Sequence, residues 1–198
     1  MKKFLPWIII AVVVFGLYSW AKGFNNTAVT LKETATKTWG DVESSYQRRN
    51  DLIGNLVKTV QGAADFEKST LEAVIKARSE ATKTTIDPSN ITPEQLAAFN
   101  QAQSGLSSAL SRLLVTVERY PDLKANQNFL ELQSQLEGTE NRINVARDRF
   151  NEAVEPYNKH IKTFPNSLLA GLFNFESLNY FKAEAGSEKA PDVDFNFK

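Results

Sequence analysis

Charged side chains interrupt an apolar helical stripe in the segment SYQRRNDLIGNLVKTV, residues 45–60. Apolar residues recur there at steps of three and four, as on one face of a helix, but Arg49 takes one position of that stripe, beside Arg48 and Asp51. A buried guanidinium needs a partner, because an unpaired buried charge is very costly. Such a group can fix the register of helices, bind a partner or act in catalysis.

Partners for this cluster lie in a later helical segment. Glu140 and Arg147 are seven residues apart and share a heptad position. We expect Glu140 to pair with Arg48 or Arg49, and Asp51 to pair with Arg147. Polar residues at core positions fix helix register and partner choice, so a structural role is favoured, and a ligand or partner site along the stripe is the alternative. A parallel row of asparagines follows the same spacing: Asn144, Asn151 and Asn158.

Groups suited to catalysis are scarce in this chain. His160 is the only histidine, and its heptad position predicts a packed side chain. The absence of cysteine excludes disulfides, thiolate zinc sites and cysteine nucleophiles. The chain contains no histidine–carboxylate metal motif, glycine-rich phosphate loop or nucleophile elbow. We therefore predict a protein that is not an enzyme and needs no cofactor or metal.

The charge balance narrows the class of partner. The chain of 198 residues carries 23 lysines and arginines and 23 aspartates and glutamates, so its net charge is zero. Nucleic-acid binding is not expected without a basic excess. The length suits one domain with attachments.

An uncharged apolar run, FLPWIIIAVVVFGLYSWA, occupies residues 4–21. As a helix it reaches roughly 27 Å, just enough for a bilayer core. Trp7 near one end, with Tyr18 and Trp20 near the other, fits the aromatic belts of a membrane span. We predict a single-pass anchor over residues 1–24, with the lipid bilayer as its partner.

The flanking charges bear on the orientation of this anchor. Lys2 and Lys3 precede the run and Lys22 follows it closely. The positive-inside rule then favours an extracytoplasmic body, by a thin margin. A cleaved signal peptide is the alternative, since SWA at 19–21 fits a small-x-small cleavage site.

Helical periodicity dominates the rest of the chain. The stripe runs from Trp39 through Ala63 and more weakly to Ala77, and its phase survives across residues 49–53. This pattern favours one long helix over residues 28–84, with Gly54 as its natural kink, over a helical hairpin. A second helix is predicted over 93–120, where Thr92 and Gln95 form a capping box, and a third over 123–164. Three such helices with short links predict an all-α, antiparallel bundle, with a short fourth helix after Pro165 that either packs on the bundle or lies on a membrane surface.

The helix lengths leave part of the first helix without a partner. The second helix spans about 40 Å and cannot cover all of residues 28–84. The surface around Trp39 and Val42 then needs another cover. Either the C-terminal segment folds back onto this surface or another protomer packs there. The second possibility predicts a homo-oligomer. The bundle is assigned to residues 25–182 and a mobile tail to 183–198.

The order of motifs resembles the LemA family over nearly the whole chain. After the anchor come RRNDLIGNLVKTVQGAADFE, then AR at 77–78, and APDVDF near the end. The third helix supplies the longest match, YPDLKANQNFLELQSQLEGTENRINVARDRFNEAVEPYNKHIKTFPNSLLAGLF. The resemblance implies a bacterial cell-membrane protein with an N-terminal transmembrane helix and a helical-bundle domain. Genes of the family often lie near those of membrane proteases and other envelope proteins, which suggests such a protein as a partner.

The family pattern also implies a set of polar residues along the bundle seam. We predict that this network fixes helix register and doubles as a contact surface. Two functions stay open: a self-associating or scaffolding envelope protein, or an adaptor that presents a helical groove or its tail to a partner. The residues are Arg48, Arg49, Asp51, Asn55, Asn126, Glu140, Asn141, Arg147, Asn151, Tyr157 and Asn158.

Overall fold

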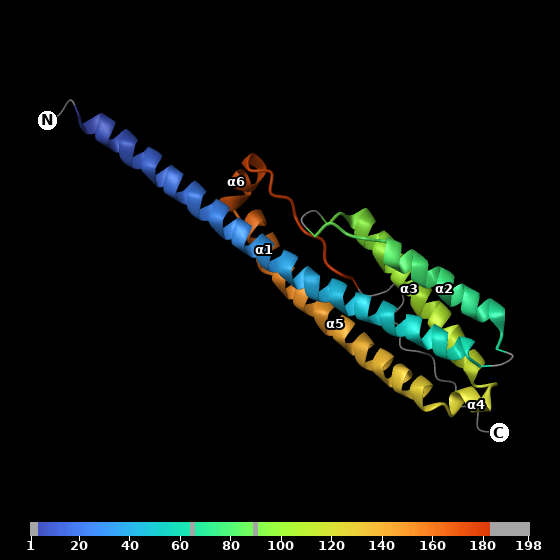
Figure 1. Cartoon of the computed structure of the whole chain (residues 1–198). Coiled ribbons are helices and arrows are strands. Elements are labelled where there is room, and N and C mark those ends of the chain that lie inside the picture. Colours follow the sequence, from blue (N-terminus) through green and yellow to red (C-terminus); the bar gives the residue numbers. More distant parts are fainter. Residues whose placement is uncertain (1–3, 64–65, 89–90, 183–198) are drawn as a thin grey trace, which may run out of the picture.

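The computed structural model describes residues 4–63, 66–88 and 91–182, and within them the chain is helical, with no strand (Figure 1). The predicted all-α fold is confirmed. The helices of the described chain are α1 (Leu5–Gln61), α2 (Lys68–Lys83), α3 (Pro93–Val117), α4 (Pro121–Lys124), α5 (Gln127–Lys162) and α6 (Asn166–Leu172).

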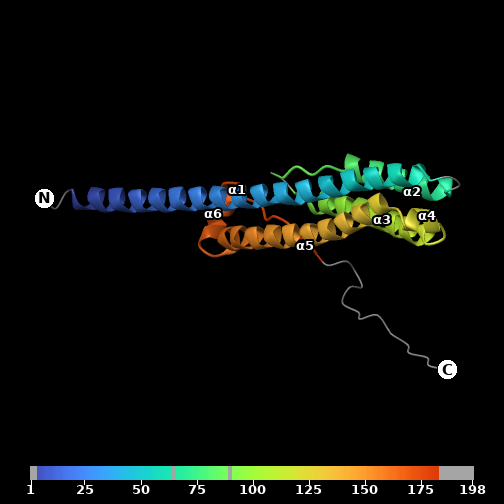
Figure 2. The same cartoon turned by 60° about the horizontal axis from the view of Figure 1, so that its bottom comes forward.

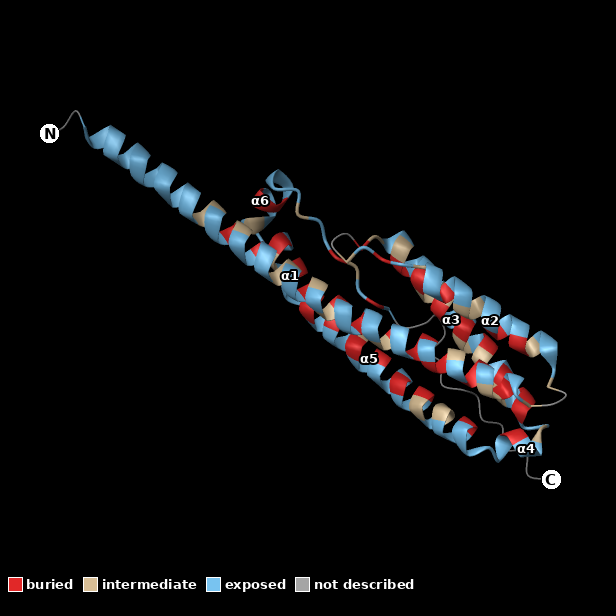
Figure 3. Ribbon diagram, in the orientation of Figure 1, coloured by how far each residue is buried: buried red, intermediate tan, exposed pale blue. Residues whose placement is uncertain are grey.

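Helix α1 is 57 residues long, which corresponds to about 85 Å. Its first part projects beyond every other helix (Figure 1). There the large apolar side chains between Phe4 and Tyr18 are 54–71% exposed, and this part of the ribbon is exposed all round (Figure 3). This segment is long and apolar enough to cross a membrane. From Trp20 onward α1 packs against the bundle.

The single helix expected over residues 28–84 is wrong. Helix α1 ends at Gln61, Gly62 forms a turn, and α2 folds back to pack on α3 and α1 (Figure 1). Phase alone did not show the break, because two antiparallel helices bury the same three-four stripe as one continuous helix. Gly54 is not the break either, since α1 runs through it.

Side-chain caps fix the starts of α3 and α5. The Thr92 hydroxyl accepts from the backbone N–H of Gln95, whose side chain accepts from the N–H of Thr92, which confirms the capping box of α3. The Asn126 side chain caps α5 through the N–H of Phe129. The third helix therefore starts a few residues later than predicted.

Buried residues of the described chain form two clusters along the bundle. The distal core, farthest from the N-terminal apolar segment, lies among α1, α2, α3 and α5. The proximal core lies mainly between α1 and α5, which run side by side (Figure 2). Trp39 is its centre, with ring centroids of Phe99, Phe150 and Phe181 at 5.8, 5.3 and 5.6 Å.

The C-terminal segment covers the part of α1 that lacked a partner in the prediction. After α6, residues 173–182 are not helical and run back along the proximal core (Figure 1). The Phe181 ring stacks on Trp39, and Val42 is completely buried. Of the two covers considered, the chain's own segment is the one observed, so the uncovered length of α1 no longer supports self-association. The tail at 183–198 lies outside the described residues.

Candidate functional site

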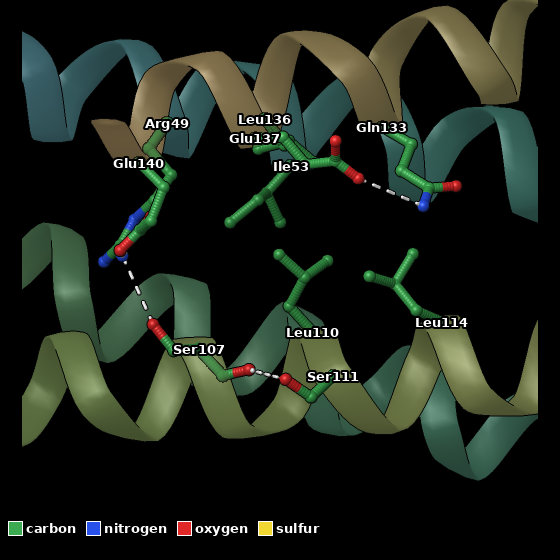
Figure 4. Close-up of a pocket in the computed structure, with 10 residues that line it drawn as sticks. All are labelled: Arg49, Ile53, Ser107, Leu110, Ser111, Leu114, Gln133, Leu136, Glu137 and Glu140. Atoms are coloured by element: carbon green, nitrogen blue, oxygen red, sulfur yellow. Dashed lines mark hydrogen bonds and ion pairs between the residues drawn. The ribbon is translucent and has the colours of Figure 1, made fainter. Parts of the chain in front are cut away.

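Arg49 lies where the two cores meet and is only 3% exposed. Its Nη1 donates to Glu140 Oε2 at 3.2 Å and to Ser107 Oγ at 3.2 Å (Figure 4). Its Nη2 donates to Gln103 Oε1. The guanidinium carbon lies 5.0 Å from the centre of the Tyr46 ring, within cation–π range. The cation is thus held by α1, α3 and α5 together.

Tyr46 keeps its hydroxyl protonated near neutral pH. Burial raises the pKa of Tyr46 above its ordinary value of 10.0, while the nearby Arg147 and Arg49 oppose this effect. The neutral ring therefore presents its π face to Arg49 without adding a second anion beside Glu140.

The arginine layer consists of Tyr46, Arg49 and Asn50 of α1 with Gln103, Ser107 and Glu140, and a further contact fixes α2 against it. Arg78 Nε donates to the backbone carbonyl of Asn50 at 2.8 Å. The Arg78 guanidinium lies over Gly54, 3.1 Å from where a Cβ would stand. Gly54 therefore leaves space for an arginine of α2, which is a different role from the predicted kink.

Not every polar atom of the arginine layer has a hydrogen-bond partner. Arg49 Nε and Asn50 Oδ1 are buried without a hydrogen-bond partner in the described part of the chain. Each unpaired buried polar atom costs free energy. The layer is better explained as a device that fixes the arrangement of helices than as a gain in stability.

Some predicted members of the network lie apart from this layer. Arg48 is exposed, so Arg49 is the arginine that pairs with Glu140. In place of the expected pair with Asp51, Arg147 donates to the carbonyl of Lys182 and lies over the Phe181 ring. Asp51 accepts from Gln47 on its own helix. The exposed remainder is Asn55, Asn126 and Asn141.

Two asparagines of the predicted row hold the C-terminal segment. The Asn158 amide donates to the carbonyl of Leu178 at 2.8 Å and accepts from its N–H at 2.9 Å. Asn151 makes the same two contacts with Phe181, at 3.0 and 2.8 Å. Each asparagine side chain thus makes the pair of hydrogen bonds that the backbone of a neighbouring β-strand would otherwise make.

Tyr157 adds a third attachment for this segment. Its hydroxyl donates to the carbonyl of Glu176 at 2.8 Å. Burial raises the pKa of the Tyr157 phenol, with a smaller contribution from the charge of Glu176.

A groove opens beside the arginine layer, between α3 and α5 (Figure 4). Its volume is about 280 Å³. Ile53 and Arg49 of α1 line it between the two helices, while leucines supply most of its apolar surface and Glu137 and Glu140 its acidic rim. Both walls follow i, i+3, i+4, i+7 spacing: Ser107, Leu110, Ser111 and Leu114 on α3, and Gln133, Leu136, Glu137 and Glu140 on α5.

Sequence reasoning did not identify Gln103, Ser107 or Arg78 as members of the site. Gln103 was visible in principle, because it interrupts the apolar stripe of α3 as Arg49 interrupts that of α1. Ser107 resembled a packing serine, and Arg78 reaches the layer only because α2 is a separate helix.

Within residues 4–63, 66–88 and 91–182, no group of three or more histidine, aspartate or glutamate side chains is placed to hold a metal. His160 is a packed residue, with its ring stacked on Phe24 at 5.0 Å and its Nε2 atom 3.2 Å from the Phe24 carbonyl oxygen.

The fold and the site define a membrane-associated, all-helical bundle protein. A model described as the LemA family matches residues 38–195, and the chain belongs to this family. The resemblance seen in the motifs is thereby confirmed.

Named relatives cover much of the chain at low identity. Magnetosome protein MamQ of Magnetospirillum gryphiswaldense is 30% identical over 173 residues, which cover 79% of this chain and 64% of that protein. Magnetosome protein MamQ 1 of Paramagnetospirillum magneticum is 28% identical over 180 residues, with 82% and 66% covered. Protein LemA of Metamycoplasma hominis is 24% identical over 142 residues, with 72% and 61% covered. The chain thus spans slightly under two thirds of the length of these relatives.

Proposed function

We propose that this protein is a non-enzymatic scaffold of the bacterial envelope that is anchored by α1 and holds a partner protein in the groove between α3 and α5. The observation that carries the proposal is the pair of matching helical stripes on either side of that groove. Membership of the LemA family, and relatives named as magnetosome proteins, favour an organising role at a membrane.

A retained anchor is favoured over a cleaved signal peptide. Helix α1 runs without a break through the candidate cleavage site at 19–21. Trp20 and Ala21 are half-buried against the proximal core, and Trp20 Nε1 donates to Asn166 Oδ1 at 3.4 Å. Cleavage after Ala21 would remove these contacts.

The occupant that fits the groove is an amphipathic helix. Apolar residues at i, i+3, i+4 and i+7 of a partner would meet the leucines of both walls. Each wall spans eight residues, about 10 Å from the first to the last, so two turns of helix are accommodated. Because Glu137 and Glu140 form the rim, lysine or arginine at the edge of the partner helix would complement it. An envelope protein such as a membrane protease is the partner class implied by the family resemblance.

The test is photocrosslinking in cells from Ser111, on the wall of the groove. A photoreactive p-benzoylphenylalanine replaces Ser111 in one variant and Ser108, which is exposed and does not line the groove, in the matched control. A foreign protein captured from position 111 and not from 108 supports the proposal. A ladder of this chain alone from position 111 would instead identify the groove as a self-association surface, and equal products from both positions would refute its role.

The tail at 183–198 offers the alternative adaptor role and lies outside the described residues. Deleting residues 183–198 should leave the crosslinks from position 111 intact if the groove is the binding site. Loss of those crosslinks on deletion would favour the tail.

The predicted extracytoplasmic position of the body can be tested separately. A cysteine at Ser108 would be the only thiol in the chain. Labelling of this cysteine by a membrane-impermeant maleimide in spheroplasts is expected. Labelling only after lysis would place the bundle in the cytoplasm.

A further inference from the structure

An exposed apolar face lies at the end of the bundle nearest the anchor. Phe164, Leu168 and Leu172 follow each other at i, i+4 spacing and are 77%, 65% and 72% exposed. Leu168 and Leu172 share one side of α6, and Phe164 lies in the turn that leads from α5 into α6. Large apolar side chains gathered on one exposed face mark an interaction site more often than single exposed residues do.

Contacts with α1 fix the height of this face relative to the anchor. Asn166, at the start of α6, accepts from Trp20 Nε1, and its amide nitrogen lies 3.4 Å from His160 Nδ1. Phe173, just after α6, stacks on Phe24 with ring centroids 6.2 Å apart. Helix α6 therefore lies beside the turn of α1 from Trp20 to Phe24, at the end of the bundle from which α1 projects (Figure 2).

This height corresponds to the lipid headgroups. Four residues of helix span about 6 Å, and the interfacial layer of a bilayer adds about 5–7 Å on each side of the hydrocarbon core. If the core ends near Ala21, α6 lies within the headgroup layer. Trp20 at the same level is a residue typical of that layer.

Lysines predominate over acidic residues at this end of the bundle, which Glu33, Glu155 and Glu176 flank in the sequence. Residues 4–32 and 156–175 contain no aspartate or glutamate. Three exposed lysines lie in these ranges: Lys22 on α1, in the turn between Trp20 and Phe24, and Lys159 and Lys162 in the last turn of α5. Helix α6 carries no lysine of its own, which argued against a membrane-surface helix from sequence, but the fold places lysines of two other helices at the same end of the bundle.

We infer that Phe164, Leu168 and Leu172 form a docking surface for the lipid bilayer, with Lys22, Lys159 and Lys162 binding anionic headgroups. The inference rests on the anchor of the proposed function and adds a second membrane contact. A single transmembrane helix allows the attached domain to tilt and rotate relative to the membrane. The α6 face holds the bundle at one height and one orientation above the membrane.

The test uses the absence of cysteine in the native chain. Leu172→Cys carries an environment-sensitive bimane probe, and Val115→Cys, which is also 72% exposed but lies on distal α3, is the matched control. The full chain is reconstituted in phosphatidylcholine vesicles, with or without phosphatidylglycerol. We expect doxyl lipids to quench the probe at 172 several-fold more than the probe at 115, and aqueous iodide to do the reverse.

Several outcomes would overturn the inference. Equal quenching at 172 and 115 in vesicle-bound protein would show that α6 does not touch lipid, while the anchor stands. A probe at 172 shielded from iodide and not quenched by lipid would mean that protein covers the face. Failure of the chain to float with vesicles would refute the anchor and the inference together.

The headgroup contact has its own test. The double variant Lys159→Gln/Lys162→Gln should weaken lipid quenching at 172 in vesicles with phosphatidylglycerol and leave it unchanged in phosphatidylcholine alone. The same loss in both lipids, or no loss in either, would overturn the role of the lysines. Both side chains are exposed, so the thermal midpoint should stay that of the native chain and confirms that the variant folds.

Discussion

Replacing Arg49 with alanine should destabilise the bundle far more than replacing its exposed neighbour Arg48. The substitution removes the donor to Gln103, which is 5% exposed, and an unsatisfied buried acceptor costs about 1–3 kcal/mol. It also removes the partner of Glu140, but this carboxylate is 51% exposed and water can solvate it. With the packing of the lost side chain included, we expect Arg49→Ala to cost about 2–4 kcal/mol.

The reciprocal change has a different cause and a comparable cost. Glu140→Ala leaves the Arg49 guanidinium buried with only neutral partners, and removing one member of a buried ion pair costs about 3–5 kcal/mol. The half-exposed residue is therefore expected to matter as much as the buried one. The double variant Arg49→Ala/Glu140→Ala should cost less than the sum of the single changes, by about 1–3 kcal/mol.

The assay is urea and thermal unfolding of the full chain in detergent, followed by far-UV circular dichroism. Unfolding costs of this size lower the midpoint of a protein of this length by roughly 5–15 °C. Arg48→Ala is the matched control and should change the unfolding free energy by less than about 0.5 kcal/mol. If Arg49→Ala and Arg48→Ala unfold alike, or if the cycle shows no coupling, the arginine layer does not hold the helices together.

Two further predictions concern the C-terminal segment. Asn158→Ala removes both hydrogen bonds with Leu178, which are worth about 2 kcal/mol in all. Hydrogen exchange at the Leu178 amide should therefore become roughly 30-fold faster. Asn144→Ala, at an exposed position, should leave this rate unchanged, and an unaltered rate in Asn158→Ala would contradict the attachment. For Tyr157, the raised pKa means that the folded state favours the neutral phenol, so its contribution is complete below about pH 10 and is lost as the pH rises through the folded-state value. The urea midpoint of Tyr157→Phe should therefore start lower at pH 8 and fall less than that of the native chain between pH 9 and 11, and equal slopes would refute the assignment.

Local signals predicted much of the helical framework. The long uncharged run identified the exposed start of α1, and a capping box with a following proline identified the start of α3. The pairing of an arginine with Glu140 followed from heptad position, although the prediction named either Arg48 or Arg49 as the partner. Burial separates them, because they lie 100° apart around the helix.

Features that depend on tertiary contacts were not predictable in this way. Residues 173–182 carry apolar side chains at nearly helical spacing, but the structure gives them a non-helical path because Asn151 and Asn158 bind their backbone groups. No local sequence pattern indicates that an asparagine side chain will make the backbone hydrogen bonds that a neighbouring strand would otherwise make. The break after Gln61 was hidden for a related reason, since α2 continues the stripe while reversing direction.

We propose that the arginine layer sets the register of α1 and α5, and this role would explain why an apolar seam contains a charge. Helices α1 and α5 pack along a heptad seam, and a seam of leucines alone would tolerate a slip of α5 by seven residues, about 10 Å. In one direction such a slip would bring Arg147 opposite Arg49, and two buried cations would repel each other. In the other it would bring Gln133, leaving a buried cation without an anion. Only the observed register places Glu140 beside Arg49, and this register also aligns α6 with the end of the apolar part of α1.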